Sequence, residues 1–299
     1  MNSTSYKYFL CLFCLSYLLF IHHTSLFILS DSNNDYLAVD FLEGSEKFIA
    51  SHAATRNATR VSLSTVSEHN VVYFSSRTNY IDAKISKWVQ EETIEQVVII
   101  AAGFDSRAYR LDLPTANFFE LDFPAVVADK QSRVQANNLS CTGKSVTYVG
   151  ADLRNTTAQE ALLSHKNFNA SLKTIYVVEG LIYYLHQPDV DKLFQSLGNV
   201  AASGSKIVFD FTNNCIIHTN CSDLNKQATQ IFLTIMDIKH EPWFSGFLPG
   251  VVQNWLSNFG FVTSELLSFQ NAGEPPLNVK TWTNSTIFGQ MNFIAAEKK

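Results

Sequence analysis

The chain has 299 residues, of which 46% are hydrophobic and 16% charged, enough apolar material for one sizeable core. Its formal net charge of −5 excludes a general basic field that recruits nucleic acid, so no nucleic-acid partner is expected beyond an RNA held by a local patch. Cysteines and histidines do not occur at zinc-binding spacing, so no metal site is predicted.

Residues 1–30 form a hydrophobic leader, with a continuously apolar run at residues 8–21 that follows Lys7. A signal-peptide core needs about 7–15 apolar residues and a transmembrane helix about 20. The leader therefore predicts either a cleaved signal peptide or a membrane anchor through residues 8–29, with a buried N-terminal helix as a third interpretation. Lys7 before the run and Asp31 after it favour placement of the following chain outside the cytosol.

Asn-x-Ser/Thr sequons point to the same compartment, because N-glycosylation requires the secretory lumen and surface loops. Chance alone supplies some of them in a chain rich in these residues. Cys215 and Cys221 can close a small disulfide loop if the domain is luminal, although ordinary thiols are the simpler interpretation. The expected localisation is membrane-anchored or secretory, with a cytosol-facing domain as the alternative. The sequons begin at Asn2, Asn57, Asn138, Asn155, Asn169, Asn220 and Asn284.

Residues 31–95 are predicted to form an N-terminal helical cap. The clearest helical pattern is NYIDAKISKWVQEE, residues 79–92. Four apolar side chains fall on one face of this helix and are expected to be buried: Ile81, Ile85, Trp88 and Val89.

Residues 96–299 are predicted to form the second, larger domain, in which strands and helices alternate. This alternation is typical of an α/β fold with a mostly parallel sheet and helices on both faces. Thr157 and Glu160 have capping-box spacing, and the last two strands can form a hairpin at the sheet edge. We expect strands at 96–102, 117–123, 145–153, 205–211, 262–269 and 291–298, a strand running into a turn at 173–185, and helices at 124–138, 155–168, 188–204, 225–238 and 250–261.

Each of the first five predicted strands ends in an acidic residue. Ligands of such sheets bind beyond the carboxyl ends of the strands, so these side chains are candidates for one site. One such acid is usually a helix cap or turn former, but five in succession are harder to explain that way. The five are Asp105, Asp122, Asp152, Glu179 and Asp210.

The turn after the first strand decides between three nucleotide ligands. NAD needs three glycines where the chain has Ala101, Gly103 and Ser106, and Asp105 adds a negative charge beside the pyrophosphate. ATP needs a Walker Gly-Lys-Ser/Thr turn, which the sequence lacks. S-adenosylmethionine has no phosphate and carries a sulfonium cation, so the acidic strand ends favour it.

Four motifs in this order resemble the leucine carboxyl methyltransferase family: AAGFDSRAYRL, FFELDFPAVVADK, VGADLR and YVVEGLIYYL. The family includes the methyltransferase of protein phosphatase 2A and polyketide carboxyl methylases, and the resemblance extends from about Arg77 to the C-terminus. It implies a Rossmann-like class I methyltransferase fold with a seven-stranded, mostly parallel sheet whose last strand is antiparallel. It also implies S-adenosyl-L-methionine as cofactor.

The resemblance assigns the methionine part of the cofactor to four residues. Arg77, in SSRTNYID, matches the arginine that holds the cofactor's carboxylate, and it can instead simply pair with a helix acid. Gly103 and Asp105 match the turn under the methionine portion. Glu179 matches the acid near the cofactor's head.

The resemblance also assigns the nucleoside part. Asp122 matches the acid that takes the ribose; Glu120 is the alternative, but side chains alternate along a strand and Asp122 stands at its end. Asp152 and Leu153 match the pair that flanks the adenine. Ala101 departs from the glycine that the family usually has, and costs on the order of 1 kcal/mol if its φ is positive.

The resulting hypothesis is methyl transfer to oxygen, with a carboxylate of a small molecule or protein terminus as acceptor. A carboxylate is already ionised and needs no general base, so no catalytic residue is assigned. The alternatives are a hydroxyl acceptor, for which His186 is the nearest histidine, or an inactive member of the fold in which Ala101 marks lost cofactor binding. Tyr183 and Tyr184 either line the acceptor pocket or pack in the core.

Overall fold

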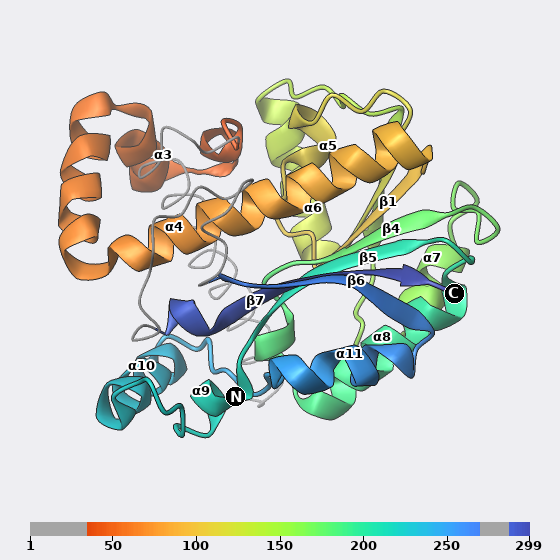
Figure 1. Cartoon of the computed structure of the whole chain (residues 1–299). Coiled ribbons are helices and arrows are strands. Elements are labelled where there is room, and N and C mark those ends of the chain that lie inside the picture. Colours follow the sequence, from red (N-terminus) through yellow and green to blue (C-terminus); the bar gives the residue numbers. More distant parts are fainter. Residues whose placement is uncertain (1–34, 270–286) are drawn as a thin grey trace, which may run out of the picture.

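The computed structural model describes residues 35–269 and 287–299, with the backbone alone at residues 45, 46, 53 and 56–72. The strands of this part of the chain form one sheet in the order β3-β2-β1-β4-β5-β7-β6 (Figure 1). Their bounds are β1 Gln96–Ile100, β2 Asn117–Asp122, β3 Ser145–Gly150, β4 Thr174–Val178, β5 Lys206–Thr212, β6 Phe261–Ser268 and β7 Met291–Lys298.

The strand directions confirm the predicted fold class. Strands β1 to β5 pair in parallel, whereas β7 runs antiparallel to both β5 and β6. The last two strands therefore form the expected terminal hairpin, with β7 inserted beside β5 and β6 at the edge. This is the seven-stranded, mostly parallel sheet that the resemblance implies.

Helices connect the strands and cover both faces of the sheet. Helix α7 starts later than predicted because the capping box between Thr157 and Glu160 begins it there, and it ends at Leu163. The shortest helices were not predicted, because three or four residues carry no helical periodicity. The helices are η2 Ala38–Phe41, α3 Gly44–Ser51, α4 Ala53–Glu92, α5 Arg107–Arg110, α6 Pro124–Ala136, α7 Ala158–Leu163, η3 Ile182–Tyr184, α8 Gln187–Val200, α9 Asn214–Ile217, α10 Lys226–Ile238, α11 Pro249–Ser257 and η5 Phe288–Gln290.

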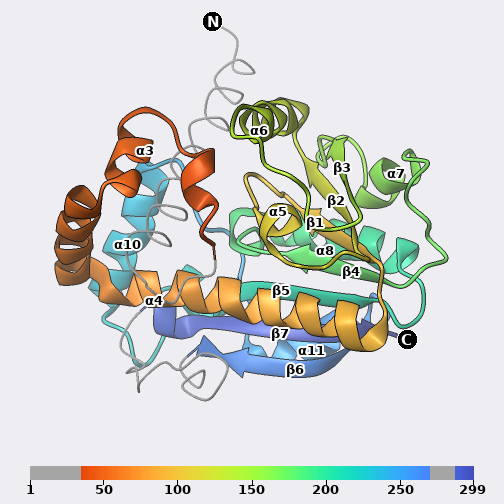
Figure 2. The ribbon, with the colours of Figure 1, turned by 90° about the horizontal axis from the view of Figure 1, so that it is seen from above.

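The core consists of one apolar cluster on each face of the sheet. All five residues of β1 are buried, and they alternate between the clusters, with Val97 and Ile99 in one and Val98 and Ile100 in the other. Helix α4 covers the first face, and α8 and α11 cover the second (Figure 2). The predicted apolar face of α4 is buried in the first cluster: Ile81, Ile85, Trp88 and Val89.

Two expectations about the N-terminal region stay predictions. The leader at residues 1–30 lies outside the described residues. Among the helices that the structure describes, none combines the length and the apolar character that crossing a membrane requires. The domain boundary at residue 95 also stays a prediction, and the C-terminal half of α4 contributes directly to the core of the sheet.

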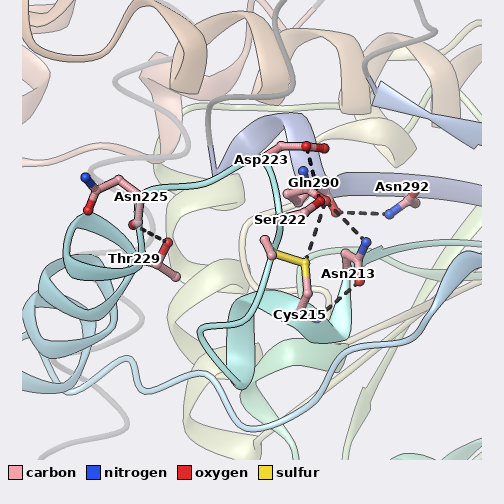
Figure 3. The surroundings of a disulfide bond; sticks show 9 residues. Asn213, Cys215, Ser222, Asp223, Asn225, Thr229, Gln290 and Asn292 are labelled. Atoms are coloured by element: carbon pink, nitrogen blue, oxygen red, sulfur yellow. Dashed lines mark hydrogen bonds between the residues drawn. A yellow bond between two sulfur atoms is a disulfide. The ribbon is translucent and has the colours of Figure 1, made fainter.

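The structure corrects the interpretation of Cys215 and Cys221 as ordinary thiols. The two residues form a disulfide, with their Cα atoms 4.8 Å apart. The bond joins α9 to the segment that leads into α10 (Figure 3). It therefore tethers the base of the insertion between β5 and α11.

Candidate cofactor and acceptor site

The carboxyl ends of β1, β2, β3, β4 and β5 meet along one edge of the sheet, because these strands are parallel and adjacent. The five predicted acids stand at these ends or in the turns just beyond them. They differ in environment, since Asp210 is fully buried, whereas the other four are partly exposed. The edge therefore combines one internal carboxylate with four that are partly exposed.

The turn after β1 has a left-handed backbone at two positions, with φ of 52° at Ala101 and 46° at Gly103. A positive φ is unfavourable for alanine by on the order of 1 kcal/mol. Ala101 therefore carries the cost that was expected for a left-handed backbone at this position. The Gly103 N–H donates to Asp122 Oδ2 at 2.7 Å, and the Phe123 N–H donates to Oδ1 at 2.6 Å. Asp122 thus fixes this turn while standing at the end of β2.

Glu120 has a different role from Asp122. Its carboxylate is buried and lies 2.7 Å from Lys130 Nζ, which also donates to the Asp105 carbonyl oxygen at 2.6 Å. Burial raises the pKa of Glu120 to about 7, although Lys130 favours the charged form. Glu120 is committed to an internal ion pair, which favours the assignment of the ribose to Asp122.

Arg77 extends from α4 into the space between β4 and β5. Its Nε donates to Glu179 Oε1 at 2.8 Å, and its Nη1 donates to Asp210 Oδ2 at 3.2 Å and to the Tyr183 hydroxyl at 3.1 Å. Burial opposes the charge of Arg77, but Asp210 and Glu179 outweigh that effect and raise its pKa. Arg77 does pair with acids, but they come from strand ends and not from its own helix.

Asp210 holds Arg77 from inside the protein. Its Oδ2 also accepts from the Tyr73 hydroxyl at 2.6 Å, and its Oδ1 accepts from the Gly180 N–H at 2.6 Å. Gly180 has a φ of 64°, and a Cβ there would lie 3.2 Å from Arg77 Nη1. Asp210 is therefore a positioning residue behind the site, which corrects its place among acids expected to face a ligand.

Two further arginines join this arrangement, and sequence reasoning assigned neither of them. Arg107 donates from Nε to Asp82 Oδ1 at 2.6 Å, lies 2.7 Å through Nη1 from Glu179 Oε2, and forms an ion pair with Asp105. Arg110 contacts Asp82 Oδ2 at 2.5 Å. The sequence feature that could have identified both arginines is the DSRAYRL motif, in which arginines three apart share a helical face.

We call this set the acid–arginine network. It holds five carboxylates and three guanidinium groups, a formal excess of two negative charges. An excess of negative charge at a partly dehydrated edge attracts a cationic ligand. The members are Asp35, Asp82, Asp105, Glu179 and Asp210, with Arg77, Arg107 and Arg110.

The predicted adenine pair lies after β3. Asp152 is partly exposed and pairs with Arg154 Nη2 at 2.7 Å, and hydrogen bonding to Arg154 lowers its pKa. Leu153 packs against the second core cluster, so its side chain is at least partly committed to the core. The adenine assignment stays a prediction for both residues.

A second group of side chains lies next to the network, which it meets through the hydrogen bond between Arg77 and Tyr183. The Tyr183 ring centroid is 4.6 Å from that of Trp243 and 4.7 Å from that of Tyr184. Glu241 is 3% exposed, yet neither its Oε1 nor Trp243 Nε1 has a hydrogen-bond partner among the residues described. Burial raises the pKa of Glu241 to about 7, although Lys239 and the Tyr184 hydroxyl favour its charged form.

We call Tyr183, Tyr184, Glu241 and Trp243 the acceptor group, after the acceptor pocket that was one of the two predictions for the tyrosines; Tyr183 is part of the first core cluster and Tyr184 packs against it. Glu241 and Trp243 were not predicted from the sequence, because they follow Tyr184 by more than fifty residues and lie in an insertion without a motif. His186, the nearest predicted base, is exposed and its ring lies 4.1 Å from that of Phe244. Glu241 is therefore the better placed candidate for proton transfer.

Comparison with known proteins matches the description leucine carboxyl methyltransferase over residues 29–198, more than half of the chain. A relative from Mycolicibacterium smegmatis is 38% identical over 142 residues, 47% of this chain and 44% of its own. One from Mycobacteroides abscessus is 36% identical over 140 residues, 46% of this chain and 45% of its own. Both carry the name "Putative S-adenosyl-L-methionine-dependent methyltransferase", and the chain spans less than half of their length.

Among solved structures, a DUF574 family protein from Streptomyces avermitilis superposes with a TM-score of 0.58 at 12% identity, over 91% of this chain and 98% of that one. At this identity the similarity concerns the fold alone. The fold agrees with the family match, which covers all four motifs. The chain belongs to the leucine carboxyl methyltransferase family.

Proposed function

We propose that the protein is an S-adenosyl-L-methionine-dependent methyltransferase that methylates oxygen, with a carboxylate of a small molecule or protein terminus as acceptor. The observation that carries this proposal is the acid–arginine network, whose excess of two negative charges suits a sulfonium cation. Family membership and the names of the two mycobacterial relatives support it.

The residues present fit such a cofactor. Arg77 uses Nε and Nη1 within the network, and no hydrogen bond from Nη2 joins it to the residues that the structure describes, which leaves N–H groups for the cofactor's carboxylate. Glu179 and Asp105 can accept from its ammonium group, and Gly103 provides the bare turn beneath it. When bound, the cofactor supplies the activated methyl group.

The nucleoside part would lie further along the edge. Asp122 has one lone pair on each oxygen beyond those that hold the turn, so it can accept from ribose hydroxyls. Asp152 and Leu153 would flank the adenine.

Tyr183 suits an oxygen acceptor. Its hydroxyl oxygen accepts from Arg77, so its own proton is available to an acceptor oxygen nearby. Burial, together with Asp210, raises the pKa of Tyr183 and keeps the phenol protonated. The rings of Tyr184 and Trp243 exclude water on the same side, and displacement at a sulfonium carbon needs such alignment and desolvation more than it needs acid–base chemistry.

A hydroxyl acceptor is the second candidate, and Glu241 is the observation that favours it. An alcohol or phenol must lose a proton as it reacts, and a buried carboxylate with a pKa of about 7 is matched to that task. A carboxylate acceptor would make no such demand on Glu241.

Two measurements test the proposal. Calorimetry with S-adenosyl-L-methionine is expected to show binding, and its absence in folded protein would leave only the inactive alternative. Transfer of a labelled methyl group to small-molecule and protein fractions of a cell extract then identifies the chemistry. Mild base should release the label as volatile methanol if the product is a carboxyl ester, whereas a label that resists base indicates the hydroxyl alternative.

A further inference from the structure

The sequons of the described chain share one structural property. The asparagines at 138, 155, 169 and 220 are all exposed, whereas six of the eleven other described asparagines are partly or fully buried. Exposure of the side chain is what an attached glycan requires in the folded protein. The four positions are therefore compatible with modification without any change of fold.

The four asparagines also lie outside strands and helices. Asn138 follows α6 with a left-handed φ of 53°, and Asn155 follows β3. Asn169 lies between α7 and β4, and Asn220 lies within the loop that the disulfide closes. Turns of this kind are where N-glycans attach in secreted proteins.

The disulfide between Cys215 and Cys221 is an independent observation that points to the same compartment. Its formation removes two electrons and two protons from the thiols, which a protein disulfide oxidant of the secretory lumen takes up. Cytosolic thiols are kept reduced. The apolar run at residues 8–21 has the composition of a segment that directs a chain to that lumen.

We propose that this domain faces the secretory lumen and carries N-linked glycans on Asn138, Asn155, Asn169 and Asn220. The donor is an oligosaccharide linked to a lipid pyrophosphate. A bond forms between the sugar C1 and the asparagine Nδ2, the C1–oxygen bond to the pyrophosphate breaks, and the amide loses one proton as the lipid pyrophosphate leaves. This inference concerns maturation and goes beyond the proposed methyl transfer.

The positions are compatible with the proposed site. The Asn169 carbonyl accepts from Gln96 Nε2 at 2.9 Å, and Gln96 is the first residue of β1, so Asn169 lies at the sheet edge opposite the network. Asn155 donates from Nδ2 to Asp152 Oδ2 at 2.9 Å, and a glycosylated amide keeps one N–H for this bond. A glycan on Asn169 would therefore lie away from the cofactor edge, and one on Asn155 would leave its hydrogen bond to Asp152 in place.

The test expresses the full chain in cultured animal cells. Peptide N-glycosidase in heavy-oxygen water turns each glycosylated asparagine into a mass-labelled aspartate, and we expect this label in the peptides of Asn138, Asn155, Asn169 and Asn220. Alkylation without reductant should leave Cys215 and Cys221 unlabelled. Unmodified asparagine at all four positions in folded protein, or two free thiols, would overturn the proposal.

Single substitutions show which asparagine carries each glycan. Asn138→Gln and Ser140→Ala should each remove the same single glycan, because the second breaks the sequon and leaves the asparagine in place. Asn199→Gln is the matched control, since Asn199 is exposed but starts no sequon. A glycan that persists in Ser140→Ala would contradict the assignment to Asn138.

Discussion

The acid–arginine network and the acceptor group lie side by side, yet their polar atoms are treated in opposite ways. Glu179 and Asp210 in the network are each satisfied by arginines, hydroxyls or backbone N–H groups. In the acceptor group, Glu241 Oε1 and Trp243 Nε1 have no partner among the residues described. The two acids of the first region are hydrogen-bonded within the protein, whereas the second region keeps hydrogen-bonding capacity that the described residues do not use.

This difference has an energetic meaning. A buried polar atom without a partner costs about 1–3 kcal/mol, which folding alone does not recover. Residues in the first region should therefore affect stability and cofactor binding, and residues in the second should affect turnover with little loss of stability. Two substitutions, at Glu241 and Asp210, examine this division, and two at Asp122 and Ala101 extend it to the neighbouring turn after β1, from the largest expected effect to the smallest.

Glu241→Gln should have the largest effect if the acceptor is a hydroxyl. Loss of a general base lowers the turnover number by about 10²–10⁴-fold. The rate of the parent protein should rise as pH increases through about 7, because the base works when deprotonated, and the variant should lose this rise. Kinetics across pH with the identified acceptor measure both effects.

Glu91→Gln, at an exposed position outside the site, is the control for the loss of one negative charge. A carboxylate acceptor predicts a change of no more than a few-fold in Glu241→Gln. That result would assign the raised pKa of Glu241 to burial without a catalytic role.

Asp210→Ala should lower the free energy of unfolding by about 3–5 kcal/mol, because it leaves a buried arginine with less compensation. Arg77, the Tyr73 hydroxyl and the Gly180 N–H all lose their shared acceptor. Denaturant unfolding, with the exposed Asp112→Ala as control, measures the loss. A loss below about 1 kcal/mol would show that the network does not depend on its buried carboxylate.

Asp122→Ala should weaken cofactor binding by about 100-fold, since charge-assisted hydrogen bonds contribute about 1.5–3 kcal/mol each. Calorimetry measures the dissociation constant, and Glu120→Gln is the informative partner variant. An equal loss of affinity in both variants would mean that the acids of β2 affect cofactor binding by fixing the turn after β1 and not by contact with the ribose. Near-normal affinity in Asp122→Ala would place the ribose elsewhere.

Ala101→Gly should have the smallest effect, a gain in unfolding free energy of about 1 kcal/mol, because glycine adopts a φ of 52° without strain. Thermal unfolding with and without cofactor separates two contributions. An equal gain in both conditions assigns the effect to backbone strain. A larger gain with cofactor means that the Ala101 methyl group hinders binding.

The sequence predicted the strands and their acidic ends well, because both signals are local. A buried strand such as β1 is an unbroken apolar run, and the acid at its end is the first polar residue after that run. The same logic found Glu179, whereas Asp122 was preferred to Glu120 because Asp122 stands at the end of its strand. It also identified the apolar face of α4, whose period of 3.6 is visible within four turns.

Pairings between distant segments could not be predicted in this way. Arg77 meets Asp210 across 133 positions of the chain, and Arg107 meets Asp82 across 25, so no spacing rule links them. Asp210 resembles the other strand-end acids in sequence, and only the packing of α4 shows that it faces inward. Glu241 lies in an insertion whose position against Tyr184 depends on the whole fold.

The disulfide stabilises the loop at the start of the insertion that carries Glu241. Closing a loop of this size contributes about 2 kcal/mol by restricting the unfolded chain. Reduction should therefore loosen α9 and α10 as a local unit while the sheet stays folded. In that state amide hydrogens of the insertion would exchange faster than those of β5, and Glu241 would lose its fixed place beside Tyr184. The redox conditions around the protein would then decide whether its proposed acceptor side is assembled.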